Sequence, residues 1–322
     1  MHRRHLIWSL AAFPLALGTG LAPGPSRAQG DGWPREVVHE AGTLTLRAAP
    51  QRIVSTSPSL TGTLLAIGVP VQATAATTRS ALTDDKGFFR QWAAVADARG
   101  VGILYPDRNF DIEALMVAAP DLVIGSATGA DSILPYLAEA EALGLPVLVL
   151  DYSSQGWQEV ARKLGRATGH EAGAEAAIRD FGARAAAAAA GLRLPPGPVN
   201  IVGYDIGGTY SIGQTASPQA QVLAALGFTV VPLPDHMRGA ITRATDGDFI
   251  SRENLAAAIT ADTVFLLRGD EAQVAAFLAD PLLANLPAVK AGAVHPLGLS
   301  SFRVDYYSAL EMIETVAAHF RA

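Results

Sequence analysis

One long helical pattern in the middle of the chain separates two stretches in which strands and helices alternate. Residues 157–192 keep helical spacing, and Gly169 precedes the longer part of this segment, from about His170 to Leu192. That part contains Ala185–Ala190, a run of the residue with the highest helix propensity. At 1.5 Å per residue it would span roughly 35 Å. Pro195-Pro196-Gly197-Pro198 then begins a new unit. We therefore expect two folded halves joined by one stiff helix.

Both halves show the pattern of βαβ units. The expected strands are apolar throughout instead of alternating with polar residues, which is typical of parallel sheets buried on both faces. They are Arg52–Thr56, Val71–Ala75, Asp121–Ser126 and Pro146–Asp151 in the first half, and Val199–Tyr204, Thr229–Val231, Asp262–Leu267 and Ala293–Leu297 in the second. We expect a loop over the glycine-rich segment Asp205–Gly213. The pattern predicts an α/β fold of two lobes with parallel central sheets.

The first residues have the features of an export signal. Arg3 and Arg4 precede an apolar stretch from Leu6 to about Leu21, and Ser26-Arg27-Ala28 places small residues at a cleavage site. Proline and glycine interrupt the stretch, whereas a membrane anchor needs about 20 unbroken apolar residues. The arginine pair also resembles a twin-arginine signal, with an ordinary secretory signal as the alternative. We expect cleavage after Ala28, no membrane anchor and a periplasmic location.

The predicted division is a signal peptide over residues 1–28, an N-terminal α/β lobe over 29–156, a helical connector over 157–194 and a C-terminal α/β lobe over 195–322. The chain has no cysteine, which excludes disulfide scaffolds, thiol enzymes and lipid attachment through cysteine. Its net charge of −6 becomes −9 on cleavage, because the signal holds three arginines and no acid. This acidic balance excludes a surface that generally binds nucleic acid.

Motifs of catalysis and metal binding are missing from the sequence. Alanine stands at the centre of Gly125–Gly129, where a nucleophile elbow needs serine. The loop Gly203–Gly208 lacks the spacing of a dinucleotide site and the lysine of a phosphate loop. The five histidines of the mature chain show no ligand spacing: His39, His170, His236, His295 and His319. Tyr306-Tyr307 is the one feature that suggests direct iron ligation, but packing in the first turn of the last helix is favoured.

Arginine is the prominent cation of the mature chain, with 18 arginines and three lysines. In open α/β sheets, ligands bind outside the carboxyl ends of the strands, so two facing sheets would form a cleft lined by the loops there. A guanidinium is flat and weakly hydrated, and therefore suits a planar anionic ligand. Ordinary solvated arginines are the alternative for any one position. The arginines in expected strand-end loops are Arg79, Arg108, Arg238, Arg243, Arg268 and Arg303.

Two expected helices, one in each half, begin with the same short pattern. Asp111-Ile112-Glu113-Ala114-Leu115 and Ser251-Arg252-Glu253-Asn254-Leu255 both place a cap residue first, then glutamate two positions on, then leucine. An acid at a helix N-terminus is stabilising by about 0.3–1 kcal/mol, which explains each glutamate alone. Repetition at corresponding positions indicates a shared surface role.

Several phrases of the sequence, spread from about Trp33 to Phe320, resemble one family. The chain is similar to the substrate-binding proteins of iron–siderophore and vitamin B12 ABC importers, and within them to the periplasmic binders of ferric enterobactin. The phrases that carry the resemblance are Arg52–Ser57, Leu60–Gly62, Leu64–Ala66, Gly87–Trp92, Pro120–Ile124, Ser126–Gly129, Glu253–Ala256, Pro281–Ala284, Leu286–Val289 and Phe302–Ala309.

The resemblance implies a class III periplasmic binding protein fold, in which one long rigid helix joins the lobes and the ligand lies between them. It implies that the chain is not an enzyme, has no cofactor or metal ligands of its own, and binds an iron(III) complex of a catecholate siderophore. We expect a monomer that delivers this ligand to an ABC permease of the inner membrane. Alternatives are a receptor for haem, cobalamin or a hydroxamate siderophore, a periplasmic siderophore esterase, and a binder of bare ferric ion.

The resemblance also implies the site residues. Arg303 stands within a shared phrase and is the best candidate for ligand contact. The full set of candidate ligand-binding residues is Arg303, Arg79, Arg243, Arg238, Phe302 and Tyr105. Glu113 and Glu253 would be the carboxylates at the lobe tips that dock on arginines of the permease.

Overall fold

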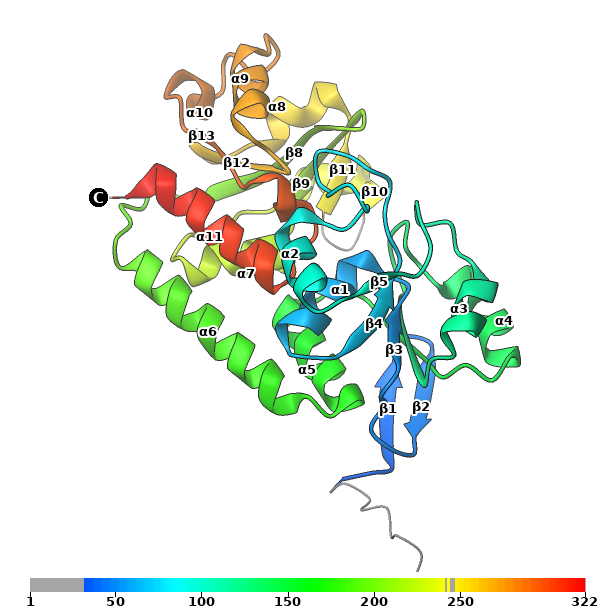
Figure 1. The fold of residues 1–322 in the computed structure, drawn as a ribbon. Coiled ribbons are helices and arrows are strands. Elements are labelled where there is room, and N and C mark those ends of the chain that lie inside the picture. The colour runs from blue at the N-terminus through cyan, green and yellow to red at the C-terminus, as the bar shows by residue number, and fades with distance from the viewer. Residues whose placement is uncertain (1–31, 241, 244–246, 322) are drawn as a thin grey trace, which may run out of the picture.

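The computed structural model describes residues 32–240, 242–243 and 247–321, and it shows two α/β lobes (Figure 1). The N-terminal lobe extends from β1 to β7 and the C-terminal lobe from β8 to α11, with α5 and α6 between them in the chain. The predicted α/β class is confirmed. The predicted signal peptide, residues 1–28, lies outside the described residues. No helix in the described ranges is long and apolar enough to cross a membrane.

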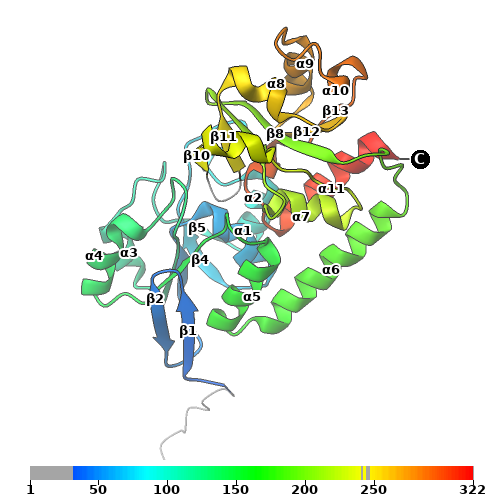
Figure 2. The same cartoon turned by 180° about the vertical axis from the view of Figure 1, so that it is seen from behind.

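The N-terminal lobe contains a five-stranded, wholly parallel sheet in the order β5-β4-β3-β6-β7. Its strands are short and mostly buried, as the apolar runs predict. A separate antiparallel hairpin, β1–β2, lies at the end of this lobe that is remote from the C-terminal lobe (Figure 2). The elements are β1 (Arg35–His39), β2 (Gly42–Leu46), β3 (Ile53–Ser55), α1 (Pro58–Ala66), β4 (Val71–Thr74), α2 (Arg90–Ala98), β5 (Gly102–Ile103), α3 (Ile112–Ala118), β6 (Leu122–Ser126), η1 (Leu134–Tyr136), α4 (Leu137–Ala142) and β7 (Val147–Leu150).

The C-terminal lobe contains a six-stranded sheet in the order β10-β11-β9-β8-β12-β13. Strands β8, β12 and β13 run parallel, as predicted, whereas β9, β10 and β11 are antiparallel to their neighbours. The elements are β8 (Val199–Ile206), β9 (Thr209–Gly213), α7 (Pro218–Ala225), η2 (Asp235–Ala240), β10 (Thr242–Arg243), β11 (Gly247–Ile250), η3 (Arg252–Asn254), α8 (Leu255–Ala258), β12 (Thr263–Leu267), α9 (Glu271–Ala279), α10 (Pro287–Lys290), β13 (Val294–Pro296), η4 (Leu299–Phe302) and α11 (Tyr306–Phe320).

The second sheet is therefore mixed, and the expected loop over Asp205–Gly213 is wrong. This segment forms the end of β8, the turn and the whole of β9, and the turn residues Gly207 and Gly208 have φ of 61° and 81°. Two adjacent glycines adopt this left-handed backbone readily, so the chain reverses within two residues and β9 must run antiparallel to β8. The expected strand Thr229–Val231 contributes one isolated bridge, between Val230 and Val199.

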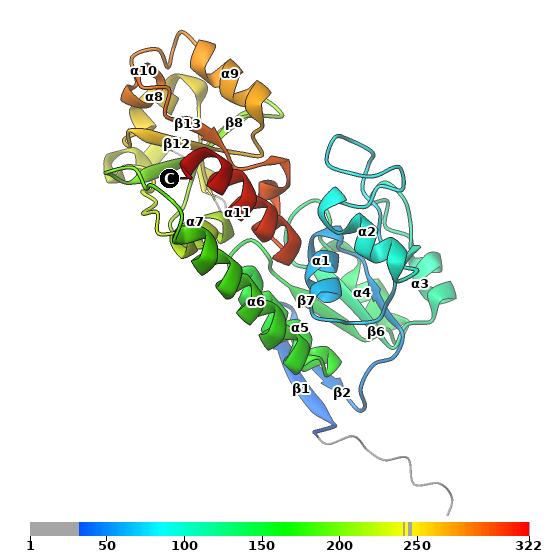
Figure 3. The same cartoon turned by 60° about the vertical axis from the view of Figure 1, so that its left-hand side comes forward.

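The connector consists of α5 (Trp157–Thr168) and α6 (Glu171–Ala189). With 19 residues, α6 is about 28 Å long. It is a packed helix and not a bare spacer: Ala174, Ala177, Phe181 and Ala185 are buried at intervals of three or four residues. Figure 3 shows α6 and α11 running alongside each other between the lobes.

One hydrophobic cluster crosses from lobe to lobe through these helices. It contains Trp92 of the N-terminal lobe, Phe181 of α6, and Phe265 and Met312 of the C-terminal lobe. Each lobe also has a smaller cluster of its own. A wide separation of the lobes would expose the shared cluster to water, so the fold restrains the angle between them.

Candidate functional site

Loops from both lobes meet at the carboxyl ends of β12 and β13. The loop between β4 and α2, residues 75–89, brings Leu82 of the N-terminal lobe to two cavities that are also lined by Leu299 and Arg268 or Arg303 of the C-terminal lobe. The larger of the two has a volume of about 250 Å³. The described residues thus form a cleft between the lobes at strand ends, the position that the sheet topology predicts for a ligand.

Two guanidinium groups of this cleft lie over the ring of Phe302. The Cζ atom of Arg303 is 3.9 Å from the centroid of the Phe302 ring, and that of Arg268 is 5.7 Å away. The ring of Tyr152, from the N-terminal side, lies 5.1 Å from Cζ of Arg303. Nη1 of Arg303 also donates to the carbonyl oxygen of Phe302. Aromatic rings that follow strands of both lobes therefore hold the Arg303 guanidinium by cation–π contacts.

Tyr152 is held in place by the half-buried carboxylate of Asp131. Its hydroxyl donates to Oδ1 of Asp131 at 2.8 Å, and the hydroxyl of Ser57 donates to Oδ2 at 2.5 Å. Burial raises the pKa of Tyr152 above its ordinary value, so the ring stays neutral and its hydroxyl acts as a donor. Sequence reasoning missed Tyr152 and Asp131. The available signal was position: both residues follow strands of the parallel sheet at the carboxyl ends.

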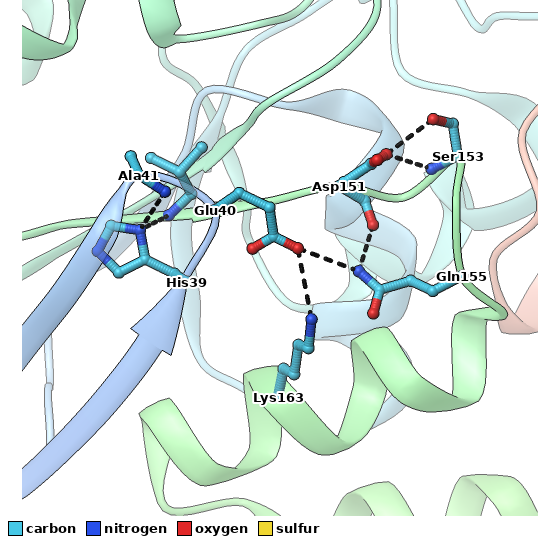
Figure 4. A network of polar contacts seen from close by, with 8 residues as sticks. His39, Glu40, Ala41, Asp151, Ser153, Gln155 and Lys163 are labelled. Atoms are coloured by element: carbon cyan, nitrogen blue, oxygen red, sulfur yellow. Dashed lines mark hydrogen bonds and ion pairs between the residues drawn. The ribbon is translucent and has the colours of Figure 1, made fainter. Parts of the chain in front are cut away.

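A polar network fixes the segment that carries Tyr152 (Figure 4). Oε1 of Glu40, in the turn of the β1–β2 hairpin, accepts from Gln155 at 3.4 Å and from Nζ of Lys163 of α5 at 3.3 Å. Gln155 also donates to the carbonyl oxygen of Asp151, whose carboxylate accepts from the backbone and hydroxyl of Ser153. These contacts with the hairpin and with α5 therefore hold the segment between β7 and α5 in place.

A second hollow of about 180 Å³ lies at the strand ends of the N-terminal lobe. Tyr105, Arg108, Phe110 and Tyr136 line it together with Asp131. The rings of Phe110 and Tyr136 are stacked with centroids 4.1 Å apart, and Tyr105 meets Phe110 edge-on. Burial raises the pKa of Tyr105, so this predicted site residue presents a neutral phenol. Asp131 connects the hollow to the cleft, because it lines the hollow and accepts a hydrogen bond from Tyr152.

Two arginines of the site have left-handed backbone, which is costly for residues other than glycine. Arg108 has φ of 57° and Arg268 has φ of 54°. Such conformations cost on the order of 1 kcal/mol each and concentrate at binding and catalytic sites. Both residues belong to the strand-end arginines of the sequence, although neither is in the narrower set of candidate contacts. The strained backbone that distinguishes them is visible only in the structure.

The remaining candidate arginines are Arg79, Arg238 and Arg243, and the structure describes each differently. Arg79 is exposed on the β4–α2 loop and does not line the cavities described above. Arg238 lies in η2 and pairs with Asp235 at 3.0 Å. Arg243 is in β10, and its side chain lies outside the described residues. The structure therefore brings together Arg303, Phe302 and Arg268 with Tyr152, whereas the contact described for Arg238 is with Asp235.

Glu113 and Glu253, the glutamates of the two matching helix starts, are exposed and lie in opposite lobes. Glu113 lies in the first turn of α3, whose N-cap Asp111 accepts from the backbone of Ala114 at 3.0 Å. Glu253 lies in η3, a short 3₁₀ turn that precedes α8. The second segment thus begins with a 3₁₀ turn and not with the α-helix that the sequence predicts. Both carboxylates are nevertheless exposed to solvent.

The alternative iron-binding features have structural roles. The hydroxyl of Tyr306 donates to Asp180 of α6, and its ring packs edge-on against Trp157. His295 and His319, remote in sequence, have ring centroids 5.4 Å apart, and burial together with His319 lowers the pKa of His295 to about 4. In the described part of the chain, no group of three or more His, Cys, Asp or Glu residues could hold a metal ion.

Comparisons with known proteins agree with this geometry. The family model described as periplasmic binding protein matches residues 53–298. The ferric enterobactin-binding periplasmic protein FepB of Escherichia coli O6:H1 (strain CFT073) is 40% identical over 304 residues, which cover 93% of this chain and 95% of FepB.

Solved structures show the same two-lobed fold. The crystal structure of holo-ViuP has a TM-score of 0.83 and 37% identity, covering 90% of this chain and 96% of ViuP. PiaA of Streptococcus pneumoniae TIGR4, solved in complex with ferrichrome, has a TM-score of 0.68 at 18% identity, with 88% and 96% covered. The family match and the identity to FepB lead to one conclusion: this chain belongs to the periplasmic binding protein family.

Proposed function

We propose that this chain captures an iron(III) complex of a catecholate siderophore between its lobes and delivers it to an ABC permease. The observation that carries the proposal is the pair of guanidiniums, those of Arg268 and Arg303, that lie over the ring of Phe302. A ferric tris-catecholate is a trianion with flat aromatic rings, and its iron is already held by catecholate oxygens. It calls for cations and aromatic faces and for no protein ligand to the metal.

The identity to a protein named for ferric enterobactin supports the catecholate class. We further propose that residues 1–28 direct export and are removed, by a secretory or twin-arginine route, and that the mature chain works as a monomer in the periplasm. No bond of the ligand is made or broken in this scheme. The hydroxyl of Ser57, a buried serine beside the site, donates to Asp131 and not to a histidine, which disfavours an esterase that uses Ser57 as its nucleophile.

A ligand screen on the purified mature chain tests this proposal. Intrinsic fluorescence would be titrated with ferric enterobactin, ferrichrome, haem, cobalamin and ferric citrate. We expect saturable binding of ferric enterobactin at a ligand concentration at least about a hundredfold lower than for the others. Tight binding of ferrichrome, haem or cobalamin instead would replace the catecholate assignment. Binding of iron from citrate alone would indicate a receptor for bare ferric ion, and loss of the intact ligand by hydrolysis would indicate an esterase.

A further inference from the structure

A buried carboxylate lies next to the cleft, where α11 begins. Asp305 is 2% exposed and stands two residues after Arg303. Its backbone N–H donates to the hydroxyl of Ser308 at 2.8 Å, and that hydroxyl donates to the carbonyl oxygen of Arg303 at 2.9 Å. Asp305 and the backbone of Arg303 therefore belong to one hydrogen-bonded turn, and the ligand site at Arg303 adjoins this carboxylate.

Gln91 of α2 connects the carboxylate to the cleft. Its Nε2 donates to Oδ2 of Asp305 at 3.3 Å, and Gln91 also lines the small cavity that is lined by Phe302 and Arg303. Figure 1 shows the start of α11 beside α1 and α2. A ligand that extends into this cavity would touch the same side chain that donates to Asp305.

The donors described for the Asp305 carboxylate are neutral. They are the amide of Gln91 and the backbone of Ser308. A Cβ atom at Gly62 would overlap both Oδ2 and the ring of Trp92, so α1 and this ring pack closely on the acid. α1 and η4 contribute no charged or titratable side chain to the surroundings, whereas the other elements packed here carry Arg90, Asp97 and Arg99 in or next to α2, Arg303, and Tyr306, Tyr307, Glu311, Glu314 and His319 of α11.

A second buried aspartate shows what a cationic partner changes. Asp280 is 5% exposed, and its Oδ2 accepts from Tyr204, which lines the larger cavity, and from Arg252 at 3.0 Å. Although burial acts against it, the hydrogen bond from Arg252 lowers the pKa of Asp280, so this acid stays ionised. At Asp305, burial prevails over the neutral donors and raises the pKa to about 6, and the like charge of Glu311 acts in the same direction. Asp305 is thus a buried acid that titrates close to neutral pH.

A trianionic ligand beside Asp305 favours the protonated acid for two reasons. Its negative charge makes the ionised form of a neighbouring carboxyl less favourable. The ligand also displaces water from the cleft, and charges interact more strongly where water is excluded. Both effects have the same sign, so binding of the ligand increases the affinity of this carboxyl for a proton.

We propose that the chain takes up a proton from solvent as it captures the ferric siderophore, and that the carboxylate of Asp305 receives this proton. The inference rests on the proposed function and deepens it. The proton bonds to a carboxylate oxygen, and no bond of the ligand is made or broken. Gln91 can then turn its amide oxygen towards the new O–H group, because an amide accepts as well as donates. Release of the ligand returns the proton to solvent.

Calorimetric titration in two buffers of different protonation enthalpy measures how many protons are taken up per ligand. The unaltered mature chain would be titrated with ferric enterobactin at pH 6.5, 7.5 and 8.5. If the ligand raises the proton affinity of Asp305 about tenfold, the uptake is about half a proton at pH 6.5 and close to zero at pH 8.5. The affinity should correspondingly fall about fivefold between pH 6 and pH 8.

Asp305→Asn and Asp305→Ser assign the proton to its site, because both remove the titrating group and keep a residue that suits an N-cap. Both should lose the uptake at pH 6.5, whereas Glu314→Gln, which alters an exposed acid of the same helix, should keep it. Titration of the ligand itself is common to all chains and cancels in this comparison. A purely structural role of Asp305 would lower the affinity of its variants but leave the proton count unchanged.

Two results would overturn the proposal while the proposed function stands: binding of ferric enterobactin without proton uptake by the unaltered chain at pH 6.5, or equal uptake by the unaltered chain and a folded Asp305 variant. Failure of the unaltered chain to bind any ferric siderophore would instead refute the proposed function, and this inference with it.

Discussion

Arg303 illustrates at the residue scale how the site is ordered in advance. Its guanidinium lies 3.9 Å from the ring centroid of Phe302 and 5.1 Å from that of Tyr152. A long arginine side chain loses rotamer freedom when it binds a ligand, and restraint by two rings reduces that loss. We infer that Arg303 contributes more to affinity than an exposed arginine that does not line these cavities, such as Arg79.

Replacing Arg303 with alanine should weaken binding of ferric enterobactin at least about tenfold, or about 1.4 kcal/mol. Lysine at this position keeps the charge but loses the flat group that stacks between the rings, so we expect an intermediate affinity. Fluorescence titration measures both effects. Arg162→Ala is the matched control, because Arg162 is exposed on α5 and pairs with Glu175. Equal affinities for the Arg303→Ala chain and the control would remove Arg303 from the site.

The left-handed backbone of Arg268 allows stability and binding to be separated at one residue. Arg268→Ala and Arg268→Gly both remove the guanidinium, so both should weaken siderophore binding. Only glycine relieves the strain at φ of 54°, and we expect the glycine chain to be more stable than the alanine chain by about 1 kcal/mol. Urea unfolding would measure the difference. A less stable glycine chain would show that the backbone at this position is not strained.

At the scale of elements, the contact between α11 and α2 depends on one buried carboxylate. Asp305 is the N-cap of α11, where Oδ1 accepts from the backbone of Ser308 at 2.9 Å. Its Oδ2 accepts from Gln91 of α2 at 3.3 Å, across the boundary between the lobes. A Cβ atom at Gly62 of α1 would overlap this carboxylate and the ring of Trp92. The close approach of α1, α2 and α11 therefore leaves no room for water around Asp305.

Burial raises the pKa of Asp305 from its ordinary value of 3.8 to about 6. The folded chain thus holds this proton more tightly than the unfolded chain, so the contribution of Asp305 to the free energy of unfolding falls as pH rises from about 4 to about 6. The difference is on the order of 3 kcal/mol. Asp305→Asn keeps a cap acceptor and removes the titration.

Urea unfolding of both chains at several pH values checks this prediction. The stability of the unaltered chain relative to Asp305→Asn should decrease between pH 4 and pH 7, by an amount on the order of 3 kcal/mol. A difference that is independent of pH would mean that Asp305 titrates with its ordinary pKa in the folded state.

At the scale of the whole molecule, the lobes share a core and carry separate docking groups. The hydrophobic cluster that joins Trp92, Phe181 and Met312 limits their relative motion, so the spacing between Glu113 and Glu253 is set by the fold. A fixed spacing suits two contacts on a rigid partner, because the second contact then forms without a further loss of freedom.

Glu113→Ala combined with Glu253→Ala should leave ferric enterobactin affinity unchanged and reduce uptake by cells about tenfold or more. Both carboxylates are exposed outside the cleft, so their removal alters no contact described for Arg303 or Phe302. Each single variant should retain part of the uptake, because the other lobe still docks. If the double variant bound the siderophore more weakly, these carboxylates would belong to the ligand site and not to the permease interface.

Much of the fold follows from local sequence. The buried apolar runs Leu122–Ser126 and Val147–Leu150 form parallel strands as predicted, because burial on both faces requires an uninterrupted apolar sequence. The β8–β9 hairpin was not predictable from apolar runs, since its direction depends on two glycines adopting left-handed backbone. The packing of α6 was likewise not predictable from the sequence. Alanine has a high helix propensity whether or not the helix packs against other elements.

The sequence by itself determined the class of the protein: alternating buried strands, a long alanine-rich helix, arginines at strand ends and, through shared phrases, a binding protein family. The tertiary structure decided which arginines meet. Arg268 and Arg303 lie on one ring because β12 and β13 end together, and Tyr152 joins them from the other lobe. Local sequence encodes propensity and burial, whereas the convergence of residues from distant strands depends on how the two sheets face each other.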